Sequence, residues 1–325
     1  MGDDADELIA GVRDGDRRAL ARAITLVEST RADHRRQATV VLEAVLSGTG
    51  DSIRIGISGA PGVGKSTFIE AFGLQLAELG HRVAVLAVDP SSSRTGGSIL
   101  GDKTRMAELS RHPDAFIRPS PGGTQLGGVA RRTREAMLMC EAAGFDVVIV
   151  ETIGVGQSEV AVADMVDLFC LLVAPGGGDE LQGIKRGIME RADLVVVNKA
   201  DGDLAAAAGR TTADYANALH LVRPKWTAWT PRAQSCSALE GTGVAEVWEA
   251  VESFRAATLG SGEAEHQRQA QAVAWMWSEV QDTLLDRLRT DTAVGALVAP
   301  LEAAVAAGAI TPTAAAMRLL DAFET

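Results

Sequence analysis

The sequence predicts an α/β fold in which a mostly parallel central sheet is flanked by helices, with a further helical segment at each end of the chain. Two observations lead to this prediction. Between residues 53 and 258, short runs rich in Val, Ile and Leu alternate with amphipathic helical stretches, and runs without polar alternation are typical of strands buried on both faces of a parallel sheet. The chain also has 325 residues, too many for one ordinary core, so one large domain with appendages is expected.

Residues 1–50 are expected to form an N-terminal helical segment. From residue 5 to residue 48 the apolar residues recur at intervals of three and four, which is the period of an amphipathic helix. The Gly/Ser-rich stretch SGTGDS at 47–52 then breaks this pattern and indicates a boundary.

Residues 51–258 are expected to form the domain that contains the sheet. Five apolar runs predict its strands, and right-handed helical crossovers would join them and cover both faces. The helix after the first strand is predicted over 66–79, because its pattern is amphipathic and Gly80 follows it. The predicted strands are 53–58, 82–89, 146–151, 167–175 and 193–199.

Residues 259–325 are expected to form a C-terminal helical arm. The Gly/Ser break at 258–265 precedes a helical pattern over 265–289, and the charge-poor stretch 293–317 predicts a pair of short alanine-rich helices rather than a membrane span. In the helix predicted over 265–289, Trp275, Trp277 and their apolar neighbours make a wide surface. That surface is compatible both with packing on the large domain and with burial between two protomers.

The composition limits the classes of partner. The formal net charge of −12 argues against a general nucleic-acid binder or a protein of anionic membrane surfaces, since both need a cationic surface. The first residues are acidic, where a secretory signal would be basic. Cys140, Cys170 and Cys236 show no paired spacing, so free thiols in a reducing cytoplasm are expected.

A glycine-rich loop predicts a phosphate-binding site after the first strand. Gly59, Gly64, Lys65 and Ser66 satisfy the pattern GxxxxGK[ST]. In such a loop, consecutive backbone N–H groups surround a phosphate and the next helix points its positive end toward it. Lys65 is expected to reach the β- and γ-phosphates and Ser66 to bind Mg²⁺. The nucleotide-binding residues expected here are Gly59, Ala60, Pro61, Gly62, Val63, Gly64, Lys65, Ser66 and Thr67.

The base is predicted to be guanine. Asn198, Lys199 and Asp201 follow an apolar run, and the Asp201 carboxylate can accept hydrogen bonds from N1–H and N2–H₂ of guanine, whereas adenine would leave that charge without a donor. Asn198 is expected to reach the far edge of the purine, and the Lys199 stem to cover a ring face. The backbone of Ser237, Ala238 and Leu239 is expected to close over the base.

The metal and catalytic groups are less sharply defined. Asp89 and Glu151 end predicted strands, and Asp102 lies in the loop that follows the strand ending at Asp89. All three compete for the Mg²⁺ position, although some of them could simply cap a helix. The segment ETIGVGQSE at 151–159 lacks a glutamine directly after its Asp-x-x-Gly-like pattern. No residue that orients the hydrolytic water is therefore assigned, and slow intrinsic hydrolysis accelerated by a partner is the hypothesis. A second loop at 175–187 is either a polar switch with Gln182 and Lys185 or an ordinary solvated loop.

Several longer motifs resemble one family. GAPGVGKST, AVDPSSSRTGGSILGDKTRM, FDVVIVETIGVGQSE, GDELQGIK and NKAD are similar to the MeaB/MMAA (ArgK-like) G-protein chaperones of methylmalonyl-CoA mutase, and the resemblance extends from RAITLVESTRADHR near the start to WMW in the tail. It implies a Mg²⁺-dependent GTPase that binds an adenosylcobalamin-dependent acyl-CoA mutase, controls cofactor loading and protects that enzyme. The adenosylcobalamin would belong to the mutase.

The resemblance also implies roles for individual residues. It places Asp89, Asp102 and Glu151 around Mg²⁺, makes 175–187 a switch that responds to the mutase, and makes 259–325 the arm of a homodimer. Lys65, Glu151, Gln182 and Lys185 are then the residues expected to act in catalysis. The stretch PGGGDE at 175–180 is richer in glycine than the family pattern, which leaves the attachment of that switch open.

Three other functions are compatible with a phosphate-binding loop. A metal-insertion GTPase would need grouped soft or imidazole ligands, whereas the five histidines are scattered. A nucleotide-gated scaffold without turnover would need the same binding groups. An amino-acid-transport ATPase or kinase, a label attached to ArgK-like sequences, conflicts with the guanine preference of Asp201.

Overall fold

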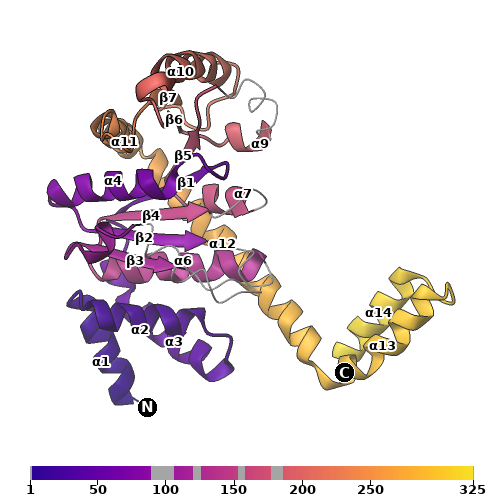
Figure 1. The fold of residues 1–325 in the computed structure, drawn as a ribbon. Helices are drawn as coiled ribbons and strands as arrows, with labels where there is room; N and C mark the ends of the chain where they lie inside the picture. The colour runs from indigo at the N-terminus through magenta and orange to yellow at the C-terminus, as the bar shows by residue number, and fades with distance from the viewer. Residues whose placement is uncertain (1, 89–105, 120–125, 153–157, 177–185, 325) are drawn as a thin grey trace. The chain divides into compact units, whose positions relative to one another are not determined.

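The computed structural model describes residues 2–88, 106–119, 126–152, 158–176 and 186–324 (Figure 1). The chain divides into two compact units, Met1–Gln271 and Ala272–Thr325.

The first unit is built around a seven-stranded sheet in which every neighbouring pair of strands runs parallel. The strand order is β3-β2-β4-β1-β5-β6-β7, so β1 lies in the middle. The strands are β1 (Ile53–Gly59), β2 (Val83–Val88), β3 (Ala115–Pro119), β4 (Val147–Thr152), β5 (Leu168–Val173), β6 (Leu194–Val197) and β7 (Arg232–Ser235). The predicted α/β class with a mostly parallel sheet is confirmed.

The prediction of five strands was incomplete, because it missed the two at the edges of the sheet. β7, with the sequence RAQS, has no fully buried residue, and a strand with one neighbour needs no continuous apolar run. β3 is five residues long and ends in Pro119, which favours an edge position. The last residues of the predicted strands 167–175 and 193–199 also lie beyond β5 and β6, in loops.

Helices cover both faces of the sheet. α4 (Lys65–Glu78) and α11 (Val244–Gly260) lie side by side on one face (Figure 1), where Phe68, Phe72 and Phe254 bury their rings against strand residues such as Ile55 and Ile57. On the other face lie α6 (Leu126–Ala142) and the short α7 (Ser158–Ala163). α10 (Ala205–Leu219) packs on β6 and β7, and α9 (Arg186–Met189) contacts α7.

The N-terminal helices pack on α6 and join the same compact unit. They are α1 (Gly2–Arg13), α2 (Arg17–Glu28) and α3 (Ala32–Val45), followed by the 3₁₀ turn η1 (Leu46–Gly48). The predicted amphipathic pattern is present in α2, which buries Leu20, Ala23, Ile24 and Val27 and is capped by Asp16, whose carboxylate accepts from Ala19 N at 2.7 Å.

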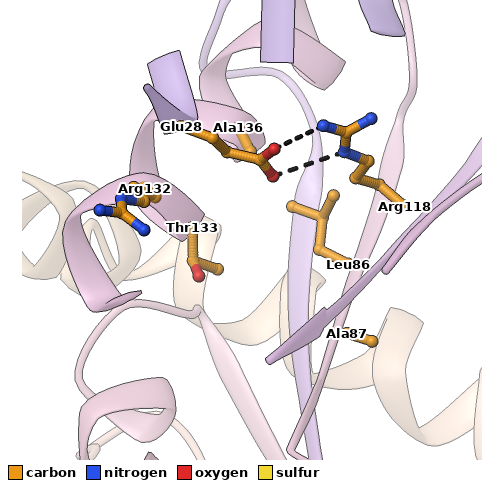
Figure 2. Close-up of a pocket in the computed structure, with 7 residues that line it drawn as sticks. All are labelled: Glu28, Leu86, Ala87, Arg118, Arg132, Thr133 and Ala136. Carbon is orange, nitrogen blue, oxygen red and sulfur yellow. Dashed lines mark hydrogen bonds and ion pairs between the residues drawn. The ribbon is translucent and has the colours of Figure 1, made fainter. Parts of the chain in front are cut away.

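An ion pair between Glu28 and Arg118 ties the end of α2 to the end of β3, beside a small pocket (Figure 2). Arg118 also donates to Thr25 Oγ1 at 3.1 Å. Burial raises the pKa of Glu28, and Arg118 opposes that shift. The N-terminal segment therefore fixes the edge of the sheet on which β3 lies.

The first two turns of α12 (Glu263–Thr290) are bonded to the carboxyl side of the α7–β5 connection. Gln267 Nε2 and Gln271 Nε2 each donate to Val166 O at 3.0 Å. Arg268 binds both carboxylate oxygens of Asp167, at 2.8 and 2.6 Å. These contacts lie entirely within the first unit.

The second unit contains the rest of α12 and the helix pair α13 (Thr292–Ala306) and α14 (Pro312–Phe323). The predicted pair of alanine-rich helices is confirmed. Asp291 caps α13 by accepting from Ala293 N at 2.8 Å, and Thr311 caps α14 by accepting from Ala314 N at 3.2 Å. No helix in the described ranges is both long and apolar enough to cross a membrane.

Candidate functional site

The loop between β1 and α4 has a shape that requires glycine. Gly64 caps α4 with φ 92° and ψ 31°, a left-handed conformation that costs a residue with a Cβ about 1–2 kcal/mol. A Cβ at Gly64 would also lie 2.7 Å from Asn198 Nδ2, and a Cβ at Gly59 would lie 2.3 Å from Leu172 O. The loop leads directly into the first turn of α4, and the unpaired N–H groups at such a helix N-terminus are the groups that bind a phosphate.

Lys65 and Ser66 occupy the first turn of α4, at the base of this loop. Lys65 Nζ donates to Gly59 O at 2.7 Å and to Ala60 O at 3.3 Å. Burial lowers the pKa of Lys65, while the charges of Glu151 and Glu159 oppose that shift. The predicted phosphate-binding lysine thus lies among loop carbonyls with two carboxylates nearby.

Glu151 brings a carboxylate to the hydroxyl of Ser66. It lies at the end of β4, is buried, and its Oε1 is 3.4 Å from Ser66 Oγ. Both side chains offer oxygen atoms, the ligand type that Mg²⁺ prefers, so these two residues fit the predicted metal position. Asp89 and Asp102, the other predicted Mg²⁺ residues, lie outside the described residues, as do Gln182 and Lys185.

The predicted base-binding residues meet the phosphate loop at the end of β6. Asn198 is buried, and its Nδ2 donates to Val63 O at 3.0 Å while its Oδ1 accepts from Ala238 N at 3.1 Å. Lys199 has a positive φ of 61°, and its Nζ donates to Gly62 O at 2.7 Å. These side chains hold the phosphate loop and the two base loops together.

Asp201 and Ser237 face each other across the predicted base site. Ser237 Oγ donates to Asp201 Oδ2, and Ala200 N donates to Cys236 O at 3.0 Å. Leu239, the last predicted base-loop residue, is 81% exposed. The structure therefore gathers all of the described predicted site residues at the carboxyl edge of the sheet, where ligands bind in open α/β folds.

The sequence reasoning did not single out Ser58, Thr152 and Glu159. Ser58 and Thr152 are fully buried beside Gly59 and Glu151 respectively, and Glu159 is buried at the start of α7. Hydroxyl residues at or next to the last position of a buried strand were the available signal for the first two.

A parallel sheet whose middle strand leads into a glycine-shaped loop and a helix, with an Asn-Lys-x-Asp loop bonded to it, defines a P-loop GTP-binding protein. The family model "Methylmalonyl Co-A mutase-associated GTPase MeaB" matches residues 20–293. The chain belongs to this MeaB family, and it is a GTP hydrolase.

Individual proteins are also similar to this chain over nearly its whole length. A protein of Caulobacter vibrioides that is named as a GTPase is 58% identical over 320 residues, 98% of either chain. The mouse protein "Methylmalonic aciduria type A homolog, mitochondrial" is 50% identical over 330 residues, which cover 98% of this chain and 80% of the mouse protein. A crystal structure described as an LAO/AO transport system kinase is similar with a TM-score of 0.77 and 41% identity, covering 99% of this chain and 98% of that chain.

Proposed function

We propose that this GTPase is a nucleotide-dependent chaperone of methylmalonyl-CoA mutase or of a related adenosylcobalamin-dependent acyl-CoA mutase. In this role it controls the loading of adenosylcobalamin into the mutase and protects the mutase from inactivation. The observation that carries the proposal is the family match over residues 20–293, whose description names the mutase. The mouse relative, named for methylmalonic aciduria, supports it.

The described residues have definite tasks in this proposal. The loop 59–64 and the start of α4 bind the phosphates, and Lys65 exchanges its loop carbonyls for phosphate oxygens. Asp201 selects guanine by accepting from its N–H groups. Ser66 and Glu151 would hold Mg²⁺, which supplies charge neutralisation at the β- and γ-phosphates.

Turnover is proposed to be slow in the isolated protein and faster in the complex. Gln182 and Lys185 belong to the segment that the family resemblance assigns to a mutase-responsive switch, so partner binding is the event that would bring them into catalysis. The proposed setting is the reducing cytoplasm, in keeping with three free cysteines that are all buried.

The C-terminal arm is proposed to form a homodimer. Val273, Met276, Trp277 and Val280 are 57%, 53%, 58% and 39% exposed on α12. A contiguous exposed apolar patch is a feature of interaction surfaces.

The test uses the full-length protein and a purified adenosylcobalamin-dependent methylmalonyl-CoA mutase. Co-purification is measured with GDP and with a non-hydrolysable GTP analogue, and phosphate release is measured with and without the mutase. The proposal expects a nucleotide-dependent complex and faster hydrolysis within it. Equal hydrolysis rates together with no complex in either nucleotide state would refute it.

The transport-kinase name of the similar crystal structure suggests a second candidate, an ATP-dependent reaction. The base site argues against it, because an adenine ring would place its N1 acceptor against the Asp201 carboxylate. Competition binding separates the two: ATP should displace labelled GDP far less effectively than GTP does, and equal displacement would favour the kinase.

A further inference from the structure

A buried polar group lies directly behind the phosphate loop, formed by Ser58, Thr152 and Glu159. The exposed fractions of these residues are 0%, 0% and 3%. Ser58 is the last residue but one of β1, Thr152 is the last residue of β4, and Glu159 is the second residue of α7. Three separate elements therefore contribute polar side chains to one buried position, and burial of a carboxylate is costly unless it accepts hydrogen bonds.

The packing of α7 on β1 places Glu159 at this position. A Cβ at Gly56 would lie 3.0 Å from Val162 Cγ1, so the absence of a side chain at Gly56 lets α7 approach the strand closely. Val162 and Glu159 are three residues apart on α7 and lie on one face of that helix. Gly56 and Ser58 are two residues apart on β1 and lie on one face of the sheet. Val162 thus covers Gly56, and Glu159 reaches Ser58.

The hydrogen bonds in this group have one direction. Thr152 Oγ1 donates to Ser58 Oγ at 2.9 Å, and Ser58 Oγ donates to Glu159 Oε1 at 3.5 Å. An ionised carboxylate accepts and cannot donate, so Glu159 is the end of the chain and fixes the orientation of both hydroxyl groups. The last bond is long, and hydrogen bonds weaken steeply with further separation. A small displacement of α7 therefore makes or breaks it.

Each hydroxyl residue is the chain neighbour of a nucleotide-site group. Ser58 precedes Gly59, whose carbonyl accepts from Lys65 Nζ at 2.7 Å. Thr152 follows Glu151, whose carboxylate faces Ser66. The charge of Glu159 also acts on the Lys65 ammonium, where it opposes the effect of burial. The group therefore touches the backbone from which both the lysine loop and the Glu151 carboxylate extend.

We propose that Glu159 is a positioning residue for GTP hydrolysis. Through Ser58 and Thr152 it holds the ends of β1 and β4 so that Lys65 and Glu151 are correctly placed at the phosphates. The inference rests on the GTPase activity of the chain and not on the proposed mutase partner, so it stands or falls without that partner.

The test compares full-length wild type with E159Q, S58A and the double variant S58A/E159Q in single-turnover GTP hydrolysis, with GTP affinity measured in parallel. E159Q keeps the size of the side chain but can donate as well as accept, so it no longer fixes the hydroxyl direction. The expected result is a rate constant lowered about tenfold in each single variant, with the dissociation constant for GTP changed less than about threefold. The double variant should be no slower than the slower single variant, because both changes remove one chain of bonds.

The matched control is D193N. Asp193 is also a buried carboxylate, but it directly precedes β6 and so lies at the amino end of the strands, away from the nucleotide site. There it accepts from Phe169 N at 2.9 Å and from Trp226 Nε1 at 2.7 Å. D193N should alter thermal stability and leave the hydrolysis rate constant unchanged. A wild-type rate constant in E159Q would overturn the proposal, as would single-variant losses that multiply in the double variant. Wild-type turnover, measured in the same assay, reports separately on the GTPase activity itself.

Discussion

At the scale of single residues, the phosphate loop depends on glycine for two different reasons. Gly62 and Gly64 both have positive φ angles, 84° and 92°. Only Gly64 is also crowded, since its Cβ would lie 2.7 Å from Asn198 Nδ2, whereas nothing lies within 4 Å of a Cβ at Gly62. A substitution at Gly62 therefore introduces backbone strain alone, and a substitution at Gly64 introduces both backbone strain and a steric clash.

We expect G62A to lower the free energy of unfolding by about 1–2 kcal/mol, the cost of a left-handed alanine. G64A should cost an additional 1–3 kcal/mol, roughly, because the new methyl group displaces Asn198. It should also weaken GTP binding more than G62A, since the bond from Asn198 to Val63 is lost with that displacement. Urea denaturation and nucleotide titration measure both effects, and equal losses in the two variants would contradict the role given to Asn198.

The guanine preference predicts an exchange of specificity at Asp201. D201N replaces an acceptor-only group by one that donates. Its affinity for GTP should fall by about 10- to 100-fold, in line with the loss of hydrogen bonds to a charged group. Its affinity for xanthosine triphosphate should rise, because xanthine presents a carbonyl where guanine presents an amine. D203N is the control, since Asp203 is exposed and lies two positions away; a similar drop in D203N would mean that the effect is general electrostatics.

The site residues that could be predicted from the sequence are those whose spacing is fixed along the chain. Gly59 to Ser66 form one loop, so their contact follows from the pattern itself. Glu159 was not predictable in this way, because its contact with Ser58 depends on how α7 lies over β1. That arrangement is set by Gly56 and Val162, and neither residue carries a polar group that would draw attention to it.

At the scale of the elements, the interior strands were predictable and the edge strands were not. β1, β2, β4, β5 and β6 are buried on every residue, and the resulting runs of Val, Ile and Leu identify them. β7 is exposed or half-buried along its length, so its pairing with β6 leaves no apolar pattern. Its position is determined by tertiary contacts, chiefly with β6 and α10.

The start of α12 predicts a pH-dependent contribution to stability. Glu263 accepts hydrogen bonds from the hydroxyl and backbone N–H of Thr227 and from Ala228 N. These bonds lower the pKa of Glu263 from 4.5 to about 2. Because the folded-state pKa is depressed, the stabilisation is fully present above pH 4.5 and is lost as the pH falls from 4.5 toward 2.

We therefore expect E263Q to unfold at a lower urea concentration than wild type at pH 7, with the difference narrowing at pH 4. The control is E265Q, on the same helix, where the carboxylate accepts from Gln269 Nε2 at 3.3 Å. E265Q should show a small difference at both pH values. A gap between E263Q and wild type that stays constant from pH 7 to pH 4 would contradict the assignment.

At the scale of the whole molecule, the boundary between the two compact units falls inside α12, after Gln271. The residues before this boundary are bonded to the large domain. Arg268 binds Asp167 and also donates to Ser52 O at 2.5 Å, and Asp167 is buried. The helical pattern of the sequence predicted α12 as one element, but it could not show that the first turns of this helix belong to the large domain.

This division predicts different results for two truncations. A chain that ends at Gln271 keeps the Arg268–Asp167 pair and should fold, bind GDP as wild type does, and run as a monomer if the arm forms the proposed dimer. A chain that ends at Gly262 leaves the buried Asp167 carboxylate without its guanidinium partner, and losing one member of a buried pair costs about 3–5 kcal/mol. Its urea midpoint should therefore be clearly lower than that of the longer truncation.

Light scattering and urea denaturation measure the two properties separately, and full-length R268A is the matched control. R268A should lose part of the stability that the shorter truncation loses, because it keeps the contacts of Glu263 and Gln267. It should remain as oligomeric as wild type, because its arm is intact. A dimeric chain ending at Gln271 would remove the arm from the interface. Equal stabilities of the two truncations would instead show that the contacts of residues 263–271, those of Glu263 and Arg268 among them, contribute little, whatever the oligomeric state.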